Sequence, residues 1–489
     1  MLTTLGQSTR RSVDAIVVGS GPNGLAAAIT LASAGCRVLV FEAKDTIGGG
    51  ARTAELTLPG FLHDVCSAIH PLAIGSPFFR ALPLASHGLE WIHPPVALAH
   101  PFDDGSAALL DRSLEKTAAS LENDSEAYLA LMSPLVSDWE RIAPEVLAPL
   151  HFPKHPLALA RFGIPALQSA STLAKARFNS SRARGLFAGL AAHSFLPLER
   201  PLTAAFSLVL GILAHAVGWP FPRGGAQQIS NALASYFRSL GGEIITSRPI
   251  QSLEELPESR CVLLDLTPRQ IIRLAGDHLP SKYVKQLEKY RYGPGAFKID
   301  WALDGPIPFI APECAQAGTI HLGGSLEEII ASENAVWHAK VNPRPFVILA
   351  QPSLFDSTRA PQGKHTAWAY CHVPHASTAD MTEEIESQIE RFAPGFRKRI
   401  LARHVMNTQH LESYNANYVG GDINGGVQDW RQLFTRPVFG LSPYTTPMKD
   451  LFICSSSTPP GGGVHGMCGY HAARVALRRV FRAESSRIL

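Results

Sequence analysis

The chain has 489 residues, of which 46% are hydrophobic and 17% are charged, and its formal net charge at pH 7 is +3. This composition excludes a disordered protein and leaves enough apolar residues for a large core divided over about three domains. It gives no indication of a nucleic-acid-binding surface, because the arginines are scattered except for Arg478, Arg479 and Arg482, which we expect on the solvated face of a terminal helix.

The cysteines and the leader bear on the compartment. The seven cysteines form no C-x-x-C pair and no zinc-like spacing, so we expect buried free thiols and no disulfide framework. The polar leader, Met1 to Val13, includes Arg10 and Arg11 but is followed by a strand and not by the apolar core of a signal peptide. We therefore expect a cytoplasmic protein, with peripheral membrane contact left open.

A dinucleotide-binding pattern opens the ordered part of the sequence. An apolar run, Ala15 to Val18, leads into Gly19-x-Gly21-x-x-Gly24, an alanine-rich helix and a second apolar run that ends at Glu42. In this order, Gly19 allows the tight turn, Gly21 lets the backbone approach a pyrophosphate, and Gly24 lets helix and strand pack closely. We expect the amides of the first helical turn to face the phosphates. Glu42 is placed to accept hydrogen bonds from ribose hydroxyls, and it would repel the 2′-phosphate of NADP.

A second glycine run and a long helical region follow. Residues 48–53, GGGART, predict a loop that brings more backbone amides to the same ligand, the alternative being a plain surface loop. Many prolines and helical patterns then predict a mainly helical cap. Its segment Pro201 to Trp219 has no formal charge and would just span a bilayer. Its internal glycine and histidine, and the proline that follows, favour a buried or membrane-apposed helix.

Further strands predict that the nucleotide-binding sheet is discontinuous. A helix ending at Gly241 precedes the strand Glu243 to Thr246, and the strand Cys261 to Leu266 comes next. Because these strands alternate with a helix, we expect them to extend the first sheet. Strand composition then returns in a region that we interpret as an inserted substrate domain, over the segments Gly295 to Leu303, Phe346 to Gln351 and Thr366 to Val373.

Two smaller patterns lie in or near this inserted region. Asp380 and Glu383 resemble a capping box at the start of a helix that Pro394 ends. The histidines at 365, 372 and 375 have neither the spacing of a helical zinc pair nor that of a clear set of three ligands. We therefore predict hydrogen-bonded structural histidines and no metal site.

The carboxyl-terminal stretch decides which dinucleotide is expected. A strand, Leu451 to Cys454, leads to the glycine loop Gly461 to Gly466, and Met467 to Arg479 has the pattern of a helix. Too few residues follow the loop for a second βαβ unit, so it cannot form a separate NAD domain. It is better explained as a loop that returns to the first domain and meets the far half of the same cofactor. A ligand with two such ends is FAD.

These motifs, together with GWPFPRGG, YGPGAFKIDWALDGPIP and CSSSTPPGGGVHGMCGYHAA, make the chain similar to the phytoene dehydrogenase-like flavoproteins, relatives of carotenoid desaturases and isomerases in the amine oxidase superfamily. The resemblance implies an α/β fold with a Rossmann-like FAD-binding domain, an inserted α+β substrate domain and a helical cap. The corresponding boundaries are 1–75, 216–290 and 436–489 for the FAD-binding domain, 76–215 for the cap and 291–435 for the substrate domain.

The resemblance also implies a set of cofactor contacts. Many relatives have arginine directly after the double glycine, whereas Gly50 stands there in this chain and Arg52 comes two residues later. Arg52 therefore remains a candidate contact that departs from the family pattern. The other implied FAD-binding residues are Gly19, Gly21, Gly24, Glu42, Gly48, Gly49, Ile250, Gly462, Gly463, Val464 and Met467.

The leading functional hypothesis is an FAD-dependent dehydrogenase, desaturase or isomerase that acts on an apolar, isoprenoid or carotenoid-like substrate by hydride transfer to flavin. His465 is the candidate base, with Tyr470 and His471 behind it, although His465 could equally brace the loop. Without a second nucleotide domain, we expect an external electron acceptor such as oxygen or a quinone. The alternatives are an amine oxidase-type flavoenzyme and a non-catalytic prenyl-binding protein of the escort or dissociation-inhibitor type.

Overall fold

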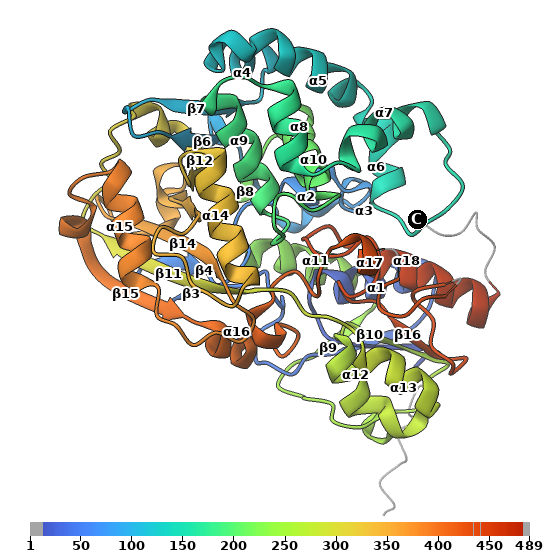
Figure 1. Ribbon diagram of the computed structural model, residues 1–489. Coiled ribbons are helices and arrows are strands. Elements are labelled where there is room, and N and C mark those ends of the chain that lie inside the picture. Colours follow the sequence, from blue (N-terminus) through green and yellow to red (C-terminus); the bar gives the residue numbers. More distant parts are fainter. Residues whose placement is uncertain (1–12, 434, 441, 483–489) are drawn as a thin grey trace, which may run out of the picture.

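The computed structural model describes residues 13–433, 435–440 and 442–482, which form two main sheets with helices around them (Figure 1). The leader, except for its last residue, lies outside these ranges. The first sheet has five strands in the order β16-β10-β1-β2-β9, and every neighbouring pair is parallel. Its strands are β1 (Ala15–Val18), β2 (Val38–Phe41), β9 (Glu243–Ile245), β10 (Cys261–Leu264) and β16 (Leu451–Ile453).

Helices cover both faces of this sheet. One face packs against α1 (Pro22–Ser33), α11 (Gln227–Ser239) and α18 (Met467–Ala476), and the other packs against α12 (Pro268–Ala275) and α13 (Ser281–Glu288). Strands β1 and β2 are buried on both faces and are apolar along their whole length, which is why these short runs could be recognised in the sequence. The sheet draws its strands from three distant stretches of the chain, as its mixed colours in Figure 1 show.

The second sheet has seven strands in the order β15-β11-β14-β13-β12-β6-β7, and only the pair β12 and β6 is parallel. Helix α15 (Thr382–Phe392) packs against one face, while α9 (Ser181–Ala192) and α14 (Leu326–Trp337) pack against the other. The strands are β6 (Val96–Pro101), β7 (Ala107–Asp111), β11 (Gly295–Leu303), β12 (Ala317–Leu322), β13 (Val347–Ala350), β14 (His365–Val373) and β15 (Ile400–Met406).

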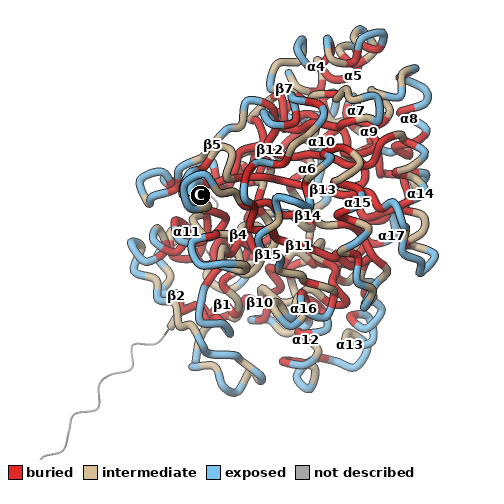
Figure 2. The backbone as a smooth tube through the Cα atoms, turned by 90° about the vertical axis from the view of Figure 1, so that its left-hand side faces the viewer, coloured by how far each residue is buried: buried red, intermediate tan, exposed pale blue. Residues whose placement is uncertain are grey.

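The helical cap lies at the top of Figure 1, and its interior is largely buried (Figure 2). The prediction of a mainly helical region was wrong in one respect, because β6 and β7 leave it to complete the edge of the seven-stranded sheet. The two strands form a local hairpin around Asp104 and Gly105, a turn signal that was overlooked, whereas the parallel pairing of β6 with β12, more than two hundred residues away, leaves no local pattern. The remaining helices of the cap are α4 (Leu114–Ser120), α5 (Ser125–Ser137), α6 (Trp139–Val146), α7 (Pro156–Ala166), α8 (Ala170–Arg177) and α10 (Thr203–Ala216).

The uncharged segment Pro201 to Trp219 forms α10 at the centre of the cap core. Its residues Leu208, Ile212 and Leu213 are fully buried against α5, α7 and α9. Of the two interpretations of this segment, the buried helix is therefore the one observed. Within the described part of the chain, no helix combines the length and the apolar character needed to cross a membrane.

Short elements join these layers. The pairs β3 (Thr53–Glu55) with β4 (Leu62–Asp64) and β5 (Trp91–Ile92) with β8 (Phe221–Pro222) are antiparallel, and the short helices are α2 (Pro71–Gly75), α3 (Pro77–Arg80), α16 (Thr408–Tyr414) and α17 (Trp430–Leu433). After α18, a π-helical turn (Leu477–Phe481) carries two exposed arginines, as expected for the chain end.

The predicted capping box before α15 is wrong. Asp380 Oδ1 accepts a hydrogen bond from the Thr382 backbone N–H (2.9 Å), but the Glu383 carboxylate accepts from Ser387 and Arg397 and does not return to the cap. Arg397, from the turn after the helix, binds the Glu383 carboxylate instead, and it lies too far along the sequence for a four-residue motif to include it.

Candidate cofactor and substrate site

The glycine turn between β1 and α1 leaves no room for side chains. Gly19 has a φ of +105°, and a Cβ added to Gly24 would lie only 2.1 Å from the Gly19 carbonyl oxygen. The first turn of α1 therefore lies against the end of β1 and borders a cavity lined by Ser20, Gly21 and Asn23. Not all of the expected amides are open to a ligand, because Pro22 has no N–H and the Gly24 N–H donates to Asp265. The Asn23 Oδ1 atom there is buried and has no protein partner, which fits a polar ligand at this helix start.

Glu42 stands at the carboxyl end of β2 on the same cavity wall. Its Oε2 accepts hydrogen bonds from the Ser20 backbone N–H (3.0 Å) and Oγ (2.6 Å), and its Oε1 accepts from the Lys44 backbone N–H (3.0 Å). Arg52 Nη2 lies 3.3 Å from Oε1 and completes a buried ion pair. Four donors thus hold the carboxylate at the edge of the sheet where a ribose is expected.

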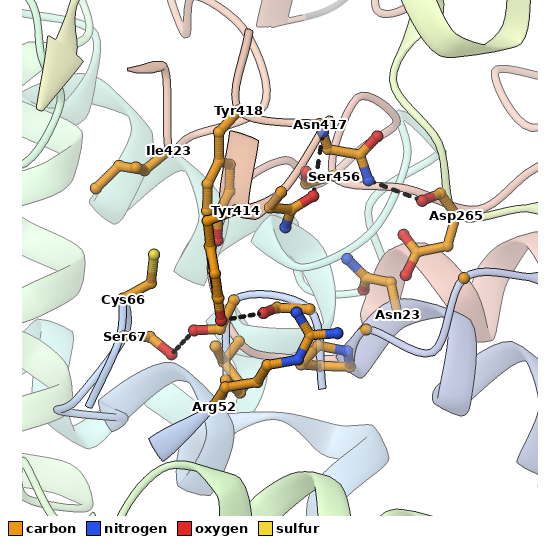
Figure 3. Close-up of a pocket in the computed structure, with 18 of the residues that line it drawn as sticks. Asn23, Arg52, Cys66, Ser67, Asp265, Tyr414, Asn417, Tyr418, Ile423 and Ser456 are labelled. Carbon is orange, nitrogen blue, oxygen red and sulfur yellow. Dashed lines mark hydrogen bonds between the residues drawn. The ribbon is translucent and has the colours of Figure 1, made fainter. Parts of the chain in front are cut away.

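The loop of residues 48–53 approaches the glycine turn from the other side. Gly48 and Gly49 have positive φ values of 122° and 54°, and the Tyr414 hydroxyl donates to the Gly49 carbonyl (2.8 Å). A Cβ on Gly50 would meet the Tyr418 hydroxyl at 2.0 Å, so the residue that departs from the family pattern is one that the tyrosine requires to be glycine. Figure 3 shows both tyrosines standing over this loop.

Arg52 lines the cavity, but its guanidinium turns back toward the protein. It donates to the carbonyl oxygens of Thr46 (2.6 Å) and Ile47 (3.3 Å) and lies 5.5 Å from the centre of the Tyr414 ring. Its observed contacts therefore shape the loop and orient Glu42. Ile250, the residue expected beside the adenine, lies on the wall of the same cavity.

Asp265 and Asn417 are site residues that the sequence did not reveal. Asp265 follows β10, and its Oδ2 accepts the backbone N–H of Gly24 (3.0 Å) directly at the glycine turn. Burial, with a smaller contribution from Glu42, raises the pKa of Asp265 to about 7, while the Gly24 hydrogen bond opposes the rise. Asn417 Nδ2 donates to the Asp265 carbonyl (2.9 Å), as drawn in Figure 3. The one available signal was an acid ending an apolar strand, as in Glu42.

The carboxyl-terminal loop closes the far side of this cavity. Gly463 and Val464 line it, whereas Met467 is buried in the first turn of α18. The ring of His465 is held from both sides, because Nδ1 accepts the Met467 backbone N–H (3.0 Å) and Nε2 lies 3.2 Å from the Gly461 carbonyl oxygen. Burial lowers the pKa of His465 to about 4. This geometry is that of a loop brace, and the catalytic role of His465 remains a prediction.

The residues behind the loop are also occupied. His471 Nε2 lies 3.1 Å from the Leu147 carbonyl oxygen, and burial lowers the pKa of this histidine to about 4. Tyr470 packs its ring against Phe78 and lies in cation–π distance of Arg474. Both side chains thus support the packing of α18 on the core.

Two cavities meet behind the loop. The first, of about 900 Å³, extends from the glycine turn to the seven-stranded sheet, and the second, of about 990 Å³, extends from the loop into the cap. Most of the second wall is aliphatic or aromatic, with Leu159, Phe162 and Phe206 as examples. The two cavities are adjacent, because both are lined by Leu72, His193, Leu210, Asn424 and Gly463.

The histidines of the inserted sheet are hydrogen-bonded. His372 Nδ1 lies 2.7 Å from Glu333 Oε2, His375 Nδ1 lies 2.8 Å from a backbone carbonyl, and His365 Nδ1 lies 3.1 Å from a serine hydroxyl. In the described residues, no three His, Cys, Asp or Glu side chains are grouped as metal ligands would be. All seven cysteines are free thiols.

The chain is similar to known proteins over nearly its whole length and not only at the glycine turn. Residues 17–82 match the NAD(P)-binding Rossmann-like domain. The rat pyridine nucleotide-disulfide oxidoreductase domain-containing protein 2 is 27% identical over 95% of this chain and 93% of its own length. Phytoene desaturase of Fusarium fujikuroi is 24% identical over 92% of this chain and 86% of its own. A structure of a putrescine oxidase triple mutant, 17% identical, covers 96% of this chain and 99% of its own with a TM-score of 0.60, which shows a shared fold.

Proposed function

We propose, from the premise that the chain is a phytoene dehydrogenase-like oxidoreductase, that it binds FAD and oxidises or isomerises an apolar, isoprenoid or carotenoid-like substrate. The observation that carries this proposal is the adjacency of the two cavities. A dinucleotide fingerprint lines one end of the first, and an apolar chamber begins where the carboxyl-terminal loop closes the other end. A long cofactor and an apolar substrate would meet at that loop.

The residues present fit FAD. The backbone of Gly21 and Asn23 at the start of α1 would hold the pyrophosphate, Glu42 the ribose and Ile250 the adenine, while Gly463 and Val464 would contact the flavin end. The positive φ of 122° at Gly463 favours glycine, which adds no side chain of its own to that end of the cavity. When bound, the flavin supplies hydride acceptance, and the chain contributes orientation, exclusion of water and a place for the proton.

His193 is the proton acceptor that we propose in place of His465. It lies on the wall of both cavities, and its Nε2 is 3.0 Å from His321 Nε2, so Nδ1 is the nitrogen left for the cavity. Burial, with a contribution from His372, lowers the pKa of His193 to about 3, which keeps the ring neutral at pH 7. The neutral ring offers a free acceptor nitrogen to the substrate, but because so low a pKa makes it a weak base, it would hold the proton only transiently.

A row of buried histidines supports this tautomer. His100 Nε2 donates to the Gly324 carbonyl (2.7 Å), which leaves His100 Nδ1 as an acceptor. A Cβ on Gly189 would lie 2.6 Å from His321 Nδ1 and 3.3 Å from His100 Nδ1, so these two unpartnered nitrogens face one space. If His321 donates from Nδ1 into that space, its Nε2 accepts from His193, whose Nδ1 is then the acceptor.

An amine oxidase-type activity is the second candidate, because the first cavity has an aromatic wall. Trp219, Trp368, Tyr370, Tyr414 and Tyr418 line it, and the rings of Trp368 and Tyr370 are stacked with centres 5.8 Å apart. Such a wall suits an uncharged amine as well as a polyene. For either substrate class, the electron acceptor that we propose is oxygen or a quinone.

The test begins with the colour of the purified protein. A yellow protein that releases FAD on denaturation supports the proposal, whereas a colourless protein that takes up no FAD refutes it and leaves a non-catalytic lipid-binding role. Glu42→Ala should weaken FAD retention, with Glu243→Ala as a matched control, since Glu243 is an exposed glutamate on the adjacent strand β9. Anaerobic screening of polyenes, lipids and amines for flavin bleaching, with product masses, then separates the two activities.

A further inference from the structure

The chain between residues 146 and 198 contains no aspartate or glutamate, although it carries six lysines and arginines. Two of these six are paired with acids from elsewhere, Arg161 with Asp138 and Arg182 with Glu122. Within the described ranges, no salt bridge involves Lys154, Lys175 or Arg177, and all three are exposed. This part of the cap therefore presents uncompensated positive charge. Those six residues are Lys154, Arg161, Lys175, Arg177, Arg182 and Arg184.

The same stretch exposes large apolar side chains, which we call the apolar rim. Figure 1 shows α7 and the loop before it at the upper right, on the opposite side of the molecule from β15. On α7 the exposed positions Leu157 and Ile164 are seven residues apart and share one helix face. The rim consists of Leu150 (74% exposed), Phe152 (97%), Leu157 (82%), Ile164 (69%) and Leu167 (60%).

Part of the rim borders the second cavity. Leu150 and Leu167 line that cavity as well as being exposed, and the buried face of α7 contributes Phe162 to its wall. From a distant part of the sequence, Phe439 is 82% exposed between two residues, Val438 and Gly440, that also line the cavity. Single exposed apolar residues are normal on a protein surface, but here two segments that border one apolar cavity both expose them, which is typical of an interaction site.

We propose that the apolar rim docks the protein on an anionic lipid bilayer. Protruding Phe and Leu side chains, on a stretch that also carries exposed lysine and arginine, have the composition of an interfacial segment. A second copy of the chain fits less well, because the same unpaired cations would face one another. This inference rests on the proposed function: the second cavity would then open toward the lipid, so that an apolar substrate could enter without crossing water.

The experiment is flotation of the full-length protein, as purified, with phosphatidylcholine vesicles that contain either no phosphatidylglycerol or 30% of it by composition. We expect binding to the anionic vesicles, weakened by high salt. The double variant Phe152→Ser/Leu157→Gln should lower the partition coefficient by about tenfold or more, since both side chains would leave the acyl region. The double variant Lys154→Glu/Lys175→Glu should lower the partition coefficient by at least about fivefold for each lysine replaced.

The control is Leu401→Gln on β15, an exposed leucine (46%) outside the rim, which should leave partition unchanged. Absence of binding to all vesicles, or an equal loss in the control variant, would overturn the proposal. So would a dimer in vesicle-free buffer, seen by light scattering, that the rim variants dissociate. FAD content is measured on the same samples, and because it needs no vesicles, failure of docking and failure of the proposed function are distinguishable.

Discussion

Replacing Asp265 with asparagine should change how FAD binding depends on pH. Moving the pKa of Asp265 from 3.8 to about 7 corresponds to about 4 kcal/mol against the ionised form, an upper value because the side chain also faces the cavity. The facing groups are Glu42, which adds negative charge, and the thiols of Cys454 and Cys468, which burial keeps neutral by raising each pKa. A pyrophosphate at the glycine turn would raise the pKa of Asp265 further.

The sign follows from this direction. Below about pH 6 the carboxyl is protonated both with and without ligand, so FAD affinity should be constant there. Above pH 7 binding must take up a proton or meet a second negative charge, and affinity should fall by up to about tenfold for each pH unit. Asp265→Asn keeps an acceptor for the Gly24 amide but carries no charge. It should bind FAD with little pH dependence and at least about tenfold more tightly at pH 8.5.

The assay is quenching of FAD fluorescence on titration with deflavinated protein between pH 5.5 and 9. Glu42→Gln is the companion variant, since it removes the other carboxylate of the cavity and should keep the decline above pH 7. If Asp265→Asn retains the slope of the parent protein, the carboxylate does not face the bound pyrophosphate and the reasoning fails.

Three further substitutions probe other contacts. Gly469→Ala would bring a Cβ to 1.8 Å from the Asn23 carbonyl, so it should separate α1 from α18, cost about 3 kcal/mol or more and lower FAD retention, as thermal unfolding and absorbance would show. Asp64→Asn breaks the buried pair with Arg359 (2.7 Å) and should cost about 3–5 kcal/mol in a denaturant titration. His193→Asn should slow flavin reduction by about 10²-fold or more, with the spectrum of the bound flavin unchanged.

Each of these has its own control. Gly163→Ala, where an added Cβ meets no atom within 4 Å, should be tolerated, and equal damage there would contradict the account of Gly469. Asp304→Asn removes an exposed ion pair with Lys364 and should change the free energy of unfolding little. A loss of stability as large as that of Asp64→Asn would show that burial does not decide the cost. If the rate of flavin reduction is unchanged in His193→Asn, or falls only together with the stability of the fold, the histidine has no role in the chemistry.

The sequence predicted those parts of the fold that local patterns specify. The β1 turn, Glu42 and the strand at 295–303 each combine residue type with close neighbours, and the structure has elements there. The place of β6 and β7 in the second sheet was missed because β6 pairs with β12, far along the chain, although the hairpin that joins β6 to β7 is local. Asp265 was missed for the same reason, since only folding brings it to Gly24. A sequence pattern that covers a few residues carries no information on a partner far along the chain.

The strand order β16-β10-β1-β2-β9 also sets a timetable for synthesis. The fingerprint strand β1 ends at Val18, whereas its neighbour β10 ends at Leu264 and β16 begins only at Leu451. At about 5–20 residues per second, β1 waits on the order of half a minute to a minute and a half for β16. During that interval the glycine turn has no complete sheet behind it, so cofactor capture has to wait until β16 has been synthesised.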